Sequence, residues 1–209
     1  SFLDAVKSYK KFDKIVCVSQ SVKDIFQNIS GNTNTIVKYN TNETEKIRKL
    51  SEEKVSDISV SYNYPIICSV AKIEYSKGYD RLIEVHKRLI DEGYKHKIYV
   101  VGTGSEEECL KKRISDLGII DSFVFLGFRE NPYKYIKMSD LYICSSRREG
   151  FSTAVTESLI LGTPVISTDC SGARELLGYN NEYGIVVQNS TEGIYEGIKM
   201  LLGNPDLIN

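Results

Sequence analysis

Short apolar runs alternate with helix-length amphipathic segments along most of the chain. The runs are rich in β-branched residues, which is typical of buried strands, and the longer segments repeat apolar positions three or four residues apart, which is typical of helices. Strands are predicted beyond Pro65 at residues 66–71, 97–101, 123–126, 141–144, 164–167 and 185–187, and a helix is predicted after each of them. This order predicts an α/β fold built on a doubly wound, parallel six-stranded sheet of the Rossmann-like type.

The first part of the chain follows a different pattern. Residues 1–45 predict a small strand–helix–strand unit, with strands at 15–18 and 35–39. Residues 46–62 are polar and charged, so they are expected to form a linker, although an exposed helix fits the same composition. The chain is therefore expected to divide into an early unit, a hinge and a sheet domain over residues 63–209.

Composition narrows the class of protein. With 209 residues, of which 41% are hydrophobic and 26% charged, the chain is long enough for one ordinary globular domain and an attached piece. The 27 basic and 28 acidic residues leave a net charge of −1, so no nucleic-acid partner is expected. No apolar run is long enough to cross a bilayer and no secretion signal opens the chain, so a cytoplasmic location is expected.

Cysteines and histidines give little support for disulfide or metal chemistry. Five cysteines are scattered without a C-x-x-C pair, and Cys17, Cys68 and Cys144 lie inside apolar runs, where reduced core residues are expected. With only His86 and His96 in the chain, a histidine-based metal site has few ligands available.

The fourth strand of the sheet domain leads into a stretch that suits an anionic ligand. Glu149 lies in the turn that follows, and a helix capped by Ser152 or Thr153 runs to Gly162. The first N–H groups of such a helix have no internal partner and favour a phosphate beside the turn. Glu157 lies roughly 6–8 Å further along the helix axis. Two carboxylates beside an anion site suit a nucleotide sugar, whereas the plainer interpretation is two solvated charges at a helix start.

Two lysines follow the first strand of the sheet domain. Lys72 and Lys77 share one strand-to-helix loop, from which both can reach a ligand's phosphates and neutralise a leaving pyrophosphate. Because lysine is common and usually exposed, ordinary surface lysines are an equally good interpretation.

The loops after the second and third strands carry weaker signals. Gly102 and Gly104 begin like a dinucleotide-binding fingerprint, but Glu107 stands where the third glycine belongs. The two glycines fit close approach to a ligand and a tight turn equally well. Phe128 and Arg129 lie in a loop that fits the border of a nucleobase, whereas Phe128 also fits a hydrophobic staple.

In this order and spacing, these segments resemble the carboxyl-terminal, donor-binding domain of retaining GT-B glycosyltransferases of the group 1 family. That family builds bacterial surface and capsular polysaccharides, lipopolysaccharides and related glycans. The resemblance covers the chain from about residue 13 onward and rests on the segments Lys72–Asp80, Phe125–Phe128, Ser139–Leu141, Glu149–Glu157 with its E-x7-E spacing, and Gly162–Ile166.

The resemblance implies a role for each matching residue. Lys77 contacts the donor pyrophosphate, Glu149 binds the sugar hydroxyls and stabilises the positive charge that develops on the sugar, and Glu157 holds the ribose hydroxyls. Backbone N–H groups near residues 151–153 hold the distal phosphate. Lys72 stands where the family has arginine, so it keeps the charge without the bidentate fork. The expected catalytic residues are Glu149, Lys77 and Lys72, and the expected donor-binding residues are Glu157, Gly150, Phe151, Ser152, Thr153, Gly102, Gly104, Phe128 and Arg129.

The resemblance also implies how the whole enzyme works. It implies no metal and no cofactor, a nucleotide-diphosphate sugar as donor, with a UDP-sugar favoured, and a glycan or lipid-linked acceptor. Residues 1–45 match the last strand–helix–strand of the amino-terminal acceptor domain, and residues 63–209 match the donor domain. Because most of the acceptor domain is expected to be missing, we expect this chain to bind the donor but to transfer nothing by itself. The full-length enzyme is expected to work in the cytoplasm, at the inner face of the membrane.

Three other interpretations stay open. A nicotinamide-dependent oxidoreductase domain fits the sheet, but it requires a glycine fingerprint after the first strand, where residues 71–74 read Ala-Lys-Ile-Glu. A non-catalytic nucleotide-sugar-binding module, whose parent enzyme has lost turnover, is a further alternative, although intact Lys77, Glu149 and Glu157 argue against it. A glycogen-synthase-like enzyme or a sugar-nucleotide epimerase would share the GT-B fold.

Overall fold

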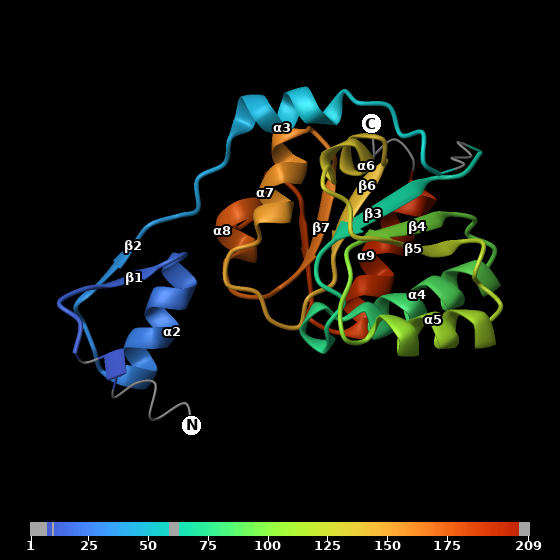
Figure 1. Ribbon diagram of the computed structural model, residues 1–209. Coiled ribbons are helices and arrows are strands. Elements are labelled where there is room, and N and C mark those ends of the chain that lie inside the picture. Colours follow the sequence, from blue (N-terminus) through green and yellow to red (C-terminus); the bar gives the residue numbers. More distant parts are fainter. Residues whose placement is uncertain (1–7, 10, 59–62, 205–209) are drawn as a thin grey trace.

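The second part of the chain folds around one parallel sheet (Figure 1). The computed structural model describes residues 8, 9, 11–58 and 63–204. The strands of this sheet are β3 (Ile66–Val70), β4 (Lys97–Val101), β5 (Phe123–Gly127), β6 (Leu141–Cys144), β7 (Val165–Thr168) and β8 (Ile185–Val187). They are ordered β5-β4-β3-β6-β7-β8, and all neighbours pair in parallel. The predicted α/β fold with a doubly wound, six-stranded sheet is confirmed.

Helices cover both faces of the sheet because its strands are apolar on both sides. They are α4 (Tyr79–Asp91), α5 (Glu107–Asp116), α6 (Tyr133–Lys137), α7 (Thr153–Ile160), α8 (Ala173–Leu177) and α9 (Thr191–Gly203). Successive side chains of a strand point to opposite faces, so Ile67 and Cys68 enter different core clusters. Ile67 shares its cluster with Leu82 of α4 and Ile198 of α9, and Cys68 shares the other with Val155 of α7. The sheet is therefore the middle of three layers.

The side of the sheet to which the chain adds strands changes at β3, which lies between β4 and β6. From β3 the chain continues outward through β4 and β5, and it then returns to β6 and continues outward on the other side. In parallel sheets a crevice forms outside the carboxyl ends of the strands at such a reversal. The loops that follow β3 and β6 border this crevice.

The first part of the chain forms a small unit beside the sheet domain (Figure 1). It consists of β1 (Ile15–Cys17), α2 (Gln20–Ser30) and β2 (Thr35–Val37), with β1 and β2 paired in parallel. We call these elements, together with Tyr39, the early unit. Residues 1–7 and 10, which the sequence assigns to the same unit, lie outside the described residues.

The range expected to be a hinge begins as a helix. α3 (Thr44–Ser51) packs against α6 and α7, and its Ile47 is 3% exposed in the core cluster of Cys68. The other side chains of α3 are mostly polar, so the composition did not distinguish this helix from a linker. The chain crosses between the two units before α3, over residues 38–43. Residues 59–62 of the expected hinge lie outside the described residues.

Several elements differ from the sequence prediction in their bounds; β2, for example, ends at Val37 rather than at 39. α9 begins at Thr191, before its first buried apolar residue Ile194, because Ser190 is its N-cap and accepts a hydrogen bond from the Gly193 N–H at 3.0 Å. Its polar first turn carries no apolar periodicity, so the pattern did not reveal it. A short 3₁₀ helix, η1 (Tyr75–Lys77), was not predicted.

Cys17, Cys68 and Cys144 are buried, as predicted, and all five cysteines are free. Burial raises the pKa of the Cys68 thiol to about 12, so it stays protonated. Within residues 8, 9, 11–58 and 63–204, no helix has the length and apolar character needed to cross a membrane.

Candidate active site

A glycine allows the loop after β3 to approach the loop after β6. η1 ends at Gly78, whose φ of 70° is in the left-handed region. A Cβ at Gly78 would lie 2.3 Å from the carbonyl oxygen of Ser145, so a larger residue would push the two loops apart. The Ser145 hydroxyl donates to the Lys77 carbonyl oxygen at 2.8 Å. This contact brings Lys77 to the carboxyl end of β6.

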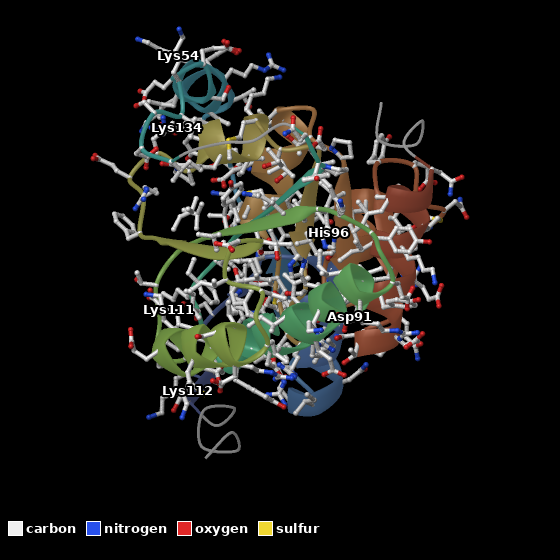
Figure 2. All side chains as sticks on the ribbon, turned by 90° about the vertical axis from the view of Figure 1, so that its right-hand side faces the viewer. Lys54, Asp91, His96, Lys111, Lys112 and Lys134 are labelled. Carbon is white, nitrogen blue, oxygen red and sulfur yellow. The ribbon has the colours of Figure 1, made fainter. Side chains whose placement is uncertain are left out.

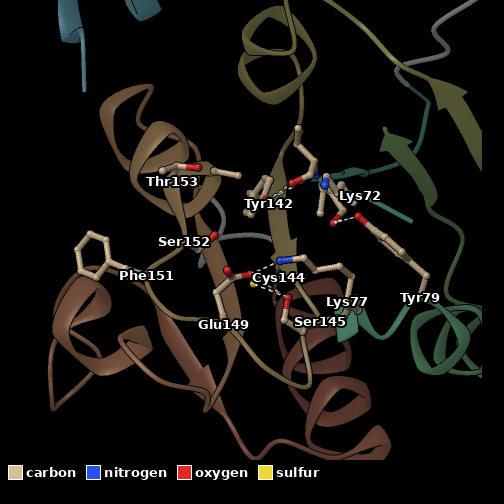
Figure 3. Close-up of a pocket in the computed structure, with 15 residues that line it drawn as sticks. Lys72, Lys77, Tyr79, Tyr142, Cys144, Ser145, Glu149, Phe151, Ser152 and Thr153 are labelled. Carbon is tan, nitrogen blue, oxygen red and sulfur yellow. Dashed lines mark hydrogen bonds and ion pairs between the residues drawn. The ribbon is translucent and has the colours of Figure 1, made fainter. Parts of the chain in front are cut away.

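Lys77 and Glu149 form an ion pair at the carboxyl ends of β3 and β6 (Figure 3). The Lys77 Nζ and Glu149 Oε2 atoms are 2.6 Å apart, and the two side chains are 20% and 19% exposed. The Ser146 hydroxyl donates to the same Oε2 at 3.3 Å. Both charges line a cavity of about 280 Å³, which we call the inner cavity. A ligand in this cavity meets one positive and one negative group.

The start of α7 borders the inner cavity. Ser152, rather than Thr153, is the N-cap, because its backbone is extended and its hydroxyl accepts from the Val155 N–H at 3.4 Å. Thr153 and Ala154 line the cavity, and their N–H groups belong to the first turn, where an α-helix offers no acceptor of its own. An anion in the cavity therefore meets hydrogen-bond donors as well as Lys77.

Lys72 lies where two cavities adjoin. It lines the inner cavity and also a second one of about 640 Å³, which we call the outer cavity, as do Val70 and Ala71. Within the described ranges Lys72 forms no ion pair, so its ammonium group is available to a ligand. The two lysines that the sequence placed in one loop thus border the same cavity.

Two buried tyrosines complete the wall of the inner cavity and were not predicted. The Tyr79 hydroxyl is 3.2 Å from the hydroxyl of Ser69, and the Tyr142 hydroxyl donates to the Val70 carbonyl oxygen at 3.2 Å. Burial raises the pKa of both tyrosine hydroxyls, so they stay protonated. Tyr142 lies inside an apolar run, where its hydroxyl leaves no pattern in the sequence.

Gly102 and Gly104 line the outer cavity and also touch neighbouring backbone. A Cβ at Gly102 would lie 2.0 Å from the Ala71 carbonyl oxygen, and one at Gly104 would lie 2.2 Å from the Ile73 carbonyl oxygen. These glycines therefore let the loop after β4 pack on the loop after β3. This contact accounts for both glycines without a dinucleotide fingerprint.

Phe128 is 72% exposed at the edge of the outer cavity, so it does not pack as a hydrophobic staple would. An exposed ring beside a cavity is suited to stacking on a planar group. Arg129 lines the same cavity, but its Nε donates to Asp57 Oδ2 at 2.9 Å and to the Tyr135 hydroxyl at 3.1 Å. Because its guanidinium group is already hydrogen-bonded within the protein, Arg129 forms part of the cavity wall.

Glu157 lies apart from the Lys77–Glu149 pair. It lines neither the inner nor the outer cavity, and the nearby hydroxyl group of Tyr133 of α6 affects its pKa; Tyr133 does line the outer cavity. Burial raises the pKa of Glu157, and the Tyr133 hydroxyl opposes that rise. Tyr133 was not predicted as a partner. A ligand in the outer cavity therefore meets Tyr133 rather than Glu157.

Opposite charges tie the loops after β3 and β6 together. The Arg147 guanidinium donates to both Asp80 carboxylate oxygens, at 2.6 and 2.7 Å, and lies 4.0 Å from the centroid of the Tyr75 ring. Bidentate pairs of this kind fix geometry as well as charge. The bond from Arg147 holds the pKa of Asp80 below its usual value. The sequence did not reveal this pair, since its members are 67 residues apart.

Metal ligands are sparse in this region. In the part of the chain that the structure describes, no group of three or more His, Cys, Asp and Glu side chains is arranged to hold a metal ion. The positive groups at the inner cavity are Lys72 and Lys77.

The fold and the site define a doubly wound α/β domain, with cationic side chains and helix N–H groups at the reversal point of its sheet, where domains of this class bind their ligands. Residues 51–209 match the model of the family described as glycosyl transferases group 1. The chain belongs to this family, and its sheet domain is the carboxyl-terminal domain of a GT-B glycosyltransferase, as predicted.

Known relatives agree with this assignment. The N-acetylgalactosamine-N,N'-diacetylbacillosaminyl-diphospho-undecaprenol 4-alpha-N-acetylgalactosaminyltransferase of Campylobacter jejuni is 31% identical over 203 residues, which cover 95% of this chain and 53% of the relative. HepE of Anabaena in complex with UDP has a TM-score of 0.76 at 21% identity, covering 96% of this chain and 57% of that one. WaaG, a glycosyltransferase involved in lipopolysaccharide biosynthesis, has a TM-score of 0.73 at 18% identity, covering 93% and 55%. The chain thus spans about half the length of these relatives.

Proposed function

We propose that this chain is the donor-binding half of a glycosyltransferase that uses a nucleotide-diphosphate sugar, with a UDP-sugar favoured. The observation that carries the proposal is the Lys77–Glu149 pair in a cavity bordered by Lys72 and by the start of α7. The outer cavity takes the nucleoside beside Phe128, and the inner cavity takes the diphosphate and the sugar. The complex of HepE with UDP supports this choice of nucleotide.

The reaction is glycosyl transfer with retention at the anomeric carbon. The bond between that carbon and the diphosphate oxygen breaks, and its electron pair stays on the oxygen. An acceptor hydroxyl forms the new bond on the same face and passes its proton to the departing diphosphate. Lys77, Lys72 and the N–H groups of α7 stabilise the negative charge on the leaving group, and Glu149 stabilises the positive charge on the sugar. Because these groups carry that task, the scheme uses no metal and no cofactor.

The acceptor is a glycan or a lipid-linked glycan in the synthesis of a surface polysaccharide. The names of the Campylobacter jejuni relative and of WaaG support this class, since one acts on a diphospho-undecaprenol-linked sugar and the other in lipopolysaccharide synthesis. This chain spans 53% of that relative, and most of the acceptor domain is expected in the part that it does not span. We therefore expect the isolated chain to bind a donor without transferring its sugar, and we expect the full-length enzyme to work at the inner face of the membrane.

A thermal-shift panel of uridine, guanosine and adenosine diphosphates and their sugars tests the proposal. A ligand that binds only the folded state stabilises it by about 2.7 kcal/mol at a hundredfold excess over Kd, so even weak binding is measurable. Lys77→Ala should abolish most of the shift, whereas Lys87→Ala, which removes a surface ion pair with Asp91, should leave it unchanged. Absence of a shift with every nucleotide of the panel would refute the proposal, and a shift with NAD alone, added as a further ligand, would favour the oxidoreductase alternative.

A further inference from the structure

The early unit contacts the loop that carries Glu149. Ser19, the N-cap of α2, accepts from the Val22 N–H at 3.1 Å and donates its hydroxyl to the Gly150 carbonyl oxygen at 3.2 Å. Ser19 is 0% exposed, whereas α2 itself has no buried residue. The start of α2 therefore packs on the candidate active site.

The hydrogen bond from Ser19 fixes the orientation of the Gly150–Phe151 peptide, which lies in the loop after β6. The Gly150 C=O and the Phe151 N–H belong to the same trans peptide, so they point in opposite directions. Since the C=O points to Ser19, the N–H points away from α2. Phe151 and Ser152 line the inner cavity, which lies on the side of Lys77. The bond from Ser19 therefore directs the Phe151 N–H away from the early unit, in a residue that lines the inner cavity.

The side chain of Phe151 is held on the opposite side of the loop. Its ring lies 5.1 Å from the ring of Tyr39, with an angle of 44° between the two planes. Figure 3 shows the Phe151 ring directed away from Lys77 and Glu149. The early unit thus engages both the Phe151 ring and the carbonyl group before it, and the N–H group is left to the cavity.

Glu175 of α8 holds the start of α2 in this position. Its Oε2 accepts from the Gln20 N–H at 2.8 Å and from the Tyr39 hydroxyl at 2.9 Å. Its Oε1 accepts from the Ser21 N–H at 2.7 Å and from the Ser21 hydroxyl at 2.5 Å. One carboxylate of the sheet domain therefore makes four hydrogen bonds to the early unit.

The charge of Glu175 suits this place. α2 has no acidic residue in its own first turn, and a negative charge at a helix N-terminus is favoured by the helix dipole. Burial alone would raise the pKa of Glu175, but the hydrogen bonds from Ser21, Gln20 and Tyr39 lower it overall. The carboxylate therefore stays ionised at neutral pH and keeps its four donors.

We propose that Glu175 and Ser19 are positioning residues for the donor. Glu175 holds α2 against α8, and Ser19 turns the Gly150–Phe151 peptide so that the Phe151 N–H faces the distal phosphate of the nucleotide. The inference rests on the proposed function, because it needs a diphosphate in the inner cavity. It gives the early unit a part in donor binding, in addition to the place in the acceptor domain that the sequence resemblance implies.

The test compares a nucleoside diphosphate with its monophosphate, because only the diphosphate has the distal phosphate. For the base that binds best among uridine, guanosine and adenosine, Kd is measured by calorimetry for both nucleotides. Glu175→Gln and Ser19→Ala should each weaken binding of the diphosphate about tenfold, as expected for the loss of one hydrogen bond to a charged group. Binding of the monophosphate should change less than twofold.

Two control variants change the same chemistry away from the loop. Glu182→Gln alters a carboxylate that accepts from the Asn180 N–H at 3.0 Å, and Ser190→Ala removes the N-cap of α9. Both should leave the ratio of the two Kd values unchanged. An equal loss for diphosphate and monophosphate in Glu175→Gln and Ser19→Ala, or no loss, would overturn the inference and leave the proposed function intact. If the wild-type chain binds no nucleotide, the proposed function fails, and the inference fails with it.

Discussion

The loops of the site approach one another closely because two glycines have no Cβ at the points of contact. Gly78 lies against the Ser145 carbonyl oxygen, and Gly104 lies against that of Ile73. Both contacts leave no room for a Cβ. Lys77 reaches Glu149, 72 residues further along the chain, because the first of these contacts is so close.

Gly104→Ala should destabilise the protein through steric overlap. The new Cβ would lie 2.2 Å from the Ile73 carbonyl oxygen and 2.6 Å from the Ile73 nitrogen and carbonyl carbon, so the two loops must separate. Overpacking of this kind costs about 1–3 kcal/mol, which urea unfolding monitored by circular dichroism can measure. Gly203→Ala is the matched control, because a Cβ there meets nothing within 4 Å. Equal stability of both variants would show that the loops separate without cost.

At the scale of elements, α4, β4 and β5 are joined by a chain of buried polar groups. His96 Nδ1 donates to the Tyr94 carbonyl oxygen at 2.9 Å, so His96 Nε2 accepts from His86 Nδ1 at 2.8 Å. His86 Nε2 then accepts from the Ser122 hydroxyl at 2.8 Å. His96 is 2% exposed, whereas Lys111 and Lys112 project outward (Figure 2). With both histidines neutral every ring nitrogen has a partner, whereas protonation of both would set the His86 Nδ1–H against the His96 Nε2–H.

This histidine chain predicts a loss of stability in mild acid. Burial lowers the pKa of His86 to about 3, with a further contribution from His96, and burial lowers that of His96 to about 4. Their pKa values are lower in the folded state than in the unfolded state, so below pH 6.5 the unfolded chain binds protons that the folded chain does not bind. From pH 8 to pH 5.5 the free energy of unfolding should fall by roughly 3 kcal/mol, which urea unfolding at the two pH values measures.

The variant with both His86→Leu and His96→Leu provides the control. The chain has two histidines, so this variant removes every histidine that titrates in that interval. Its stability should change little between pH 8 and pH 5.5, whatever its absolute value. The same pH dependence in the variant and the wild type would show that other groups are responsible.

At the scale of the whole molecule, the early unit and the sheet domain differ in how far their apolar side chains are buried. α2 has no buried residue, and its Ile25 and Ile29 are 49% and 53% exposed. α4, in contrast, buries residues on both sides of Leu82, which is 0% exposed. The early unit is therefore held to the sheet domain by a few polar contacts, chiefly those of Glu175, rather than by a shared core.

Hydrogen exchange should reveal this difference. Because local opening is easiest where few apolar contacts are lost, the amides of α2 should exchange at least about tenfold faster than those of α4. Mass spectrometry of peptic peptides measures both helices in the same sample. A nucleoside diphosphate should slow exchange in α2 if the early unit takes part in donor binding. Equal protection of α2 and α4 without ligand would contradict the expected order.

Local patterns were enough to predict the sheet domain and several members of its site. Lys72, Lys77, Glu149 and the cap at Ser152 could be found in the sequence, because strand ends, helix caps and charged loop residues leave signals within a few positions. Their partners could not be found in the same way. Tyr133 beside Glu157 comes from another element and has no local signature.

The sequence by itself determined the order of strands and helices, the family, and the charged residues at the carboxyl ends of the strands. Only the tertiary structure decided which of these groups lie together. It formed the Lys77–Glu149 pair, separated the inner from the outer cavity, and placed Glu175 in hydrogen-bonding distance of the start of α2. The physical reason is the separation along the chain over which each interaction acts. Periodicity and capping act within one or two turns of the chain, whereas a hydrogen bond across 155 residues depends on how packing sets the distance between two backbones.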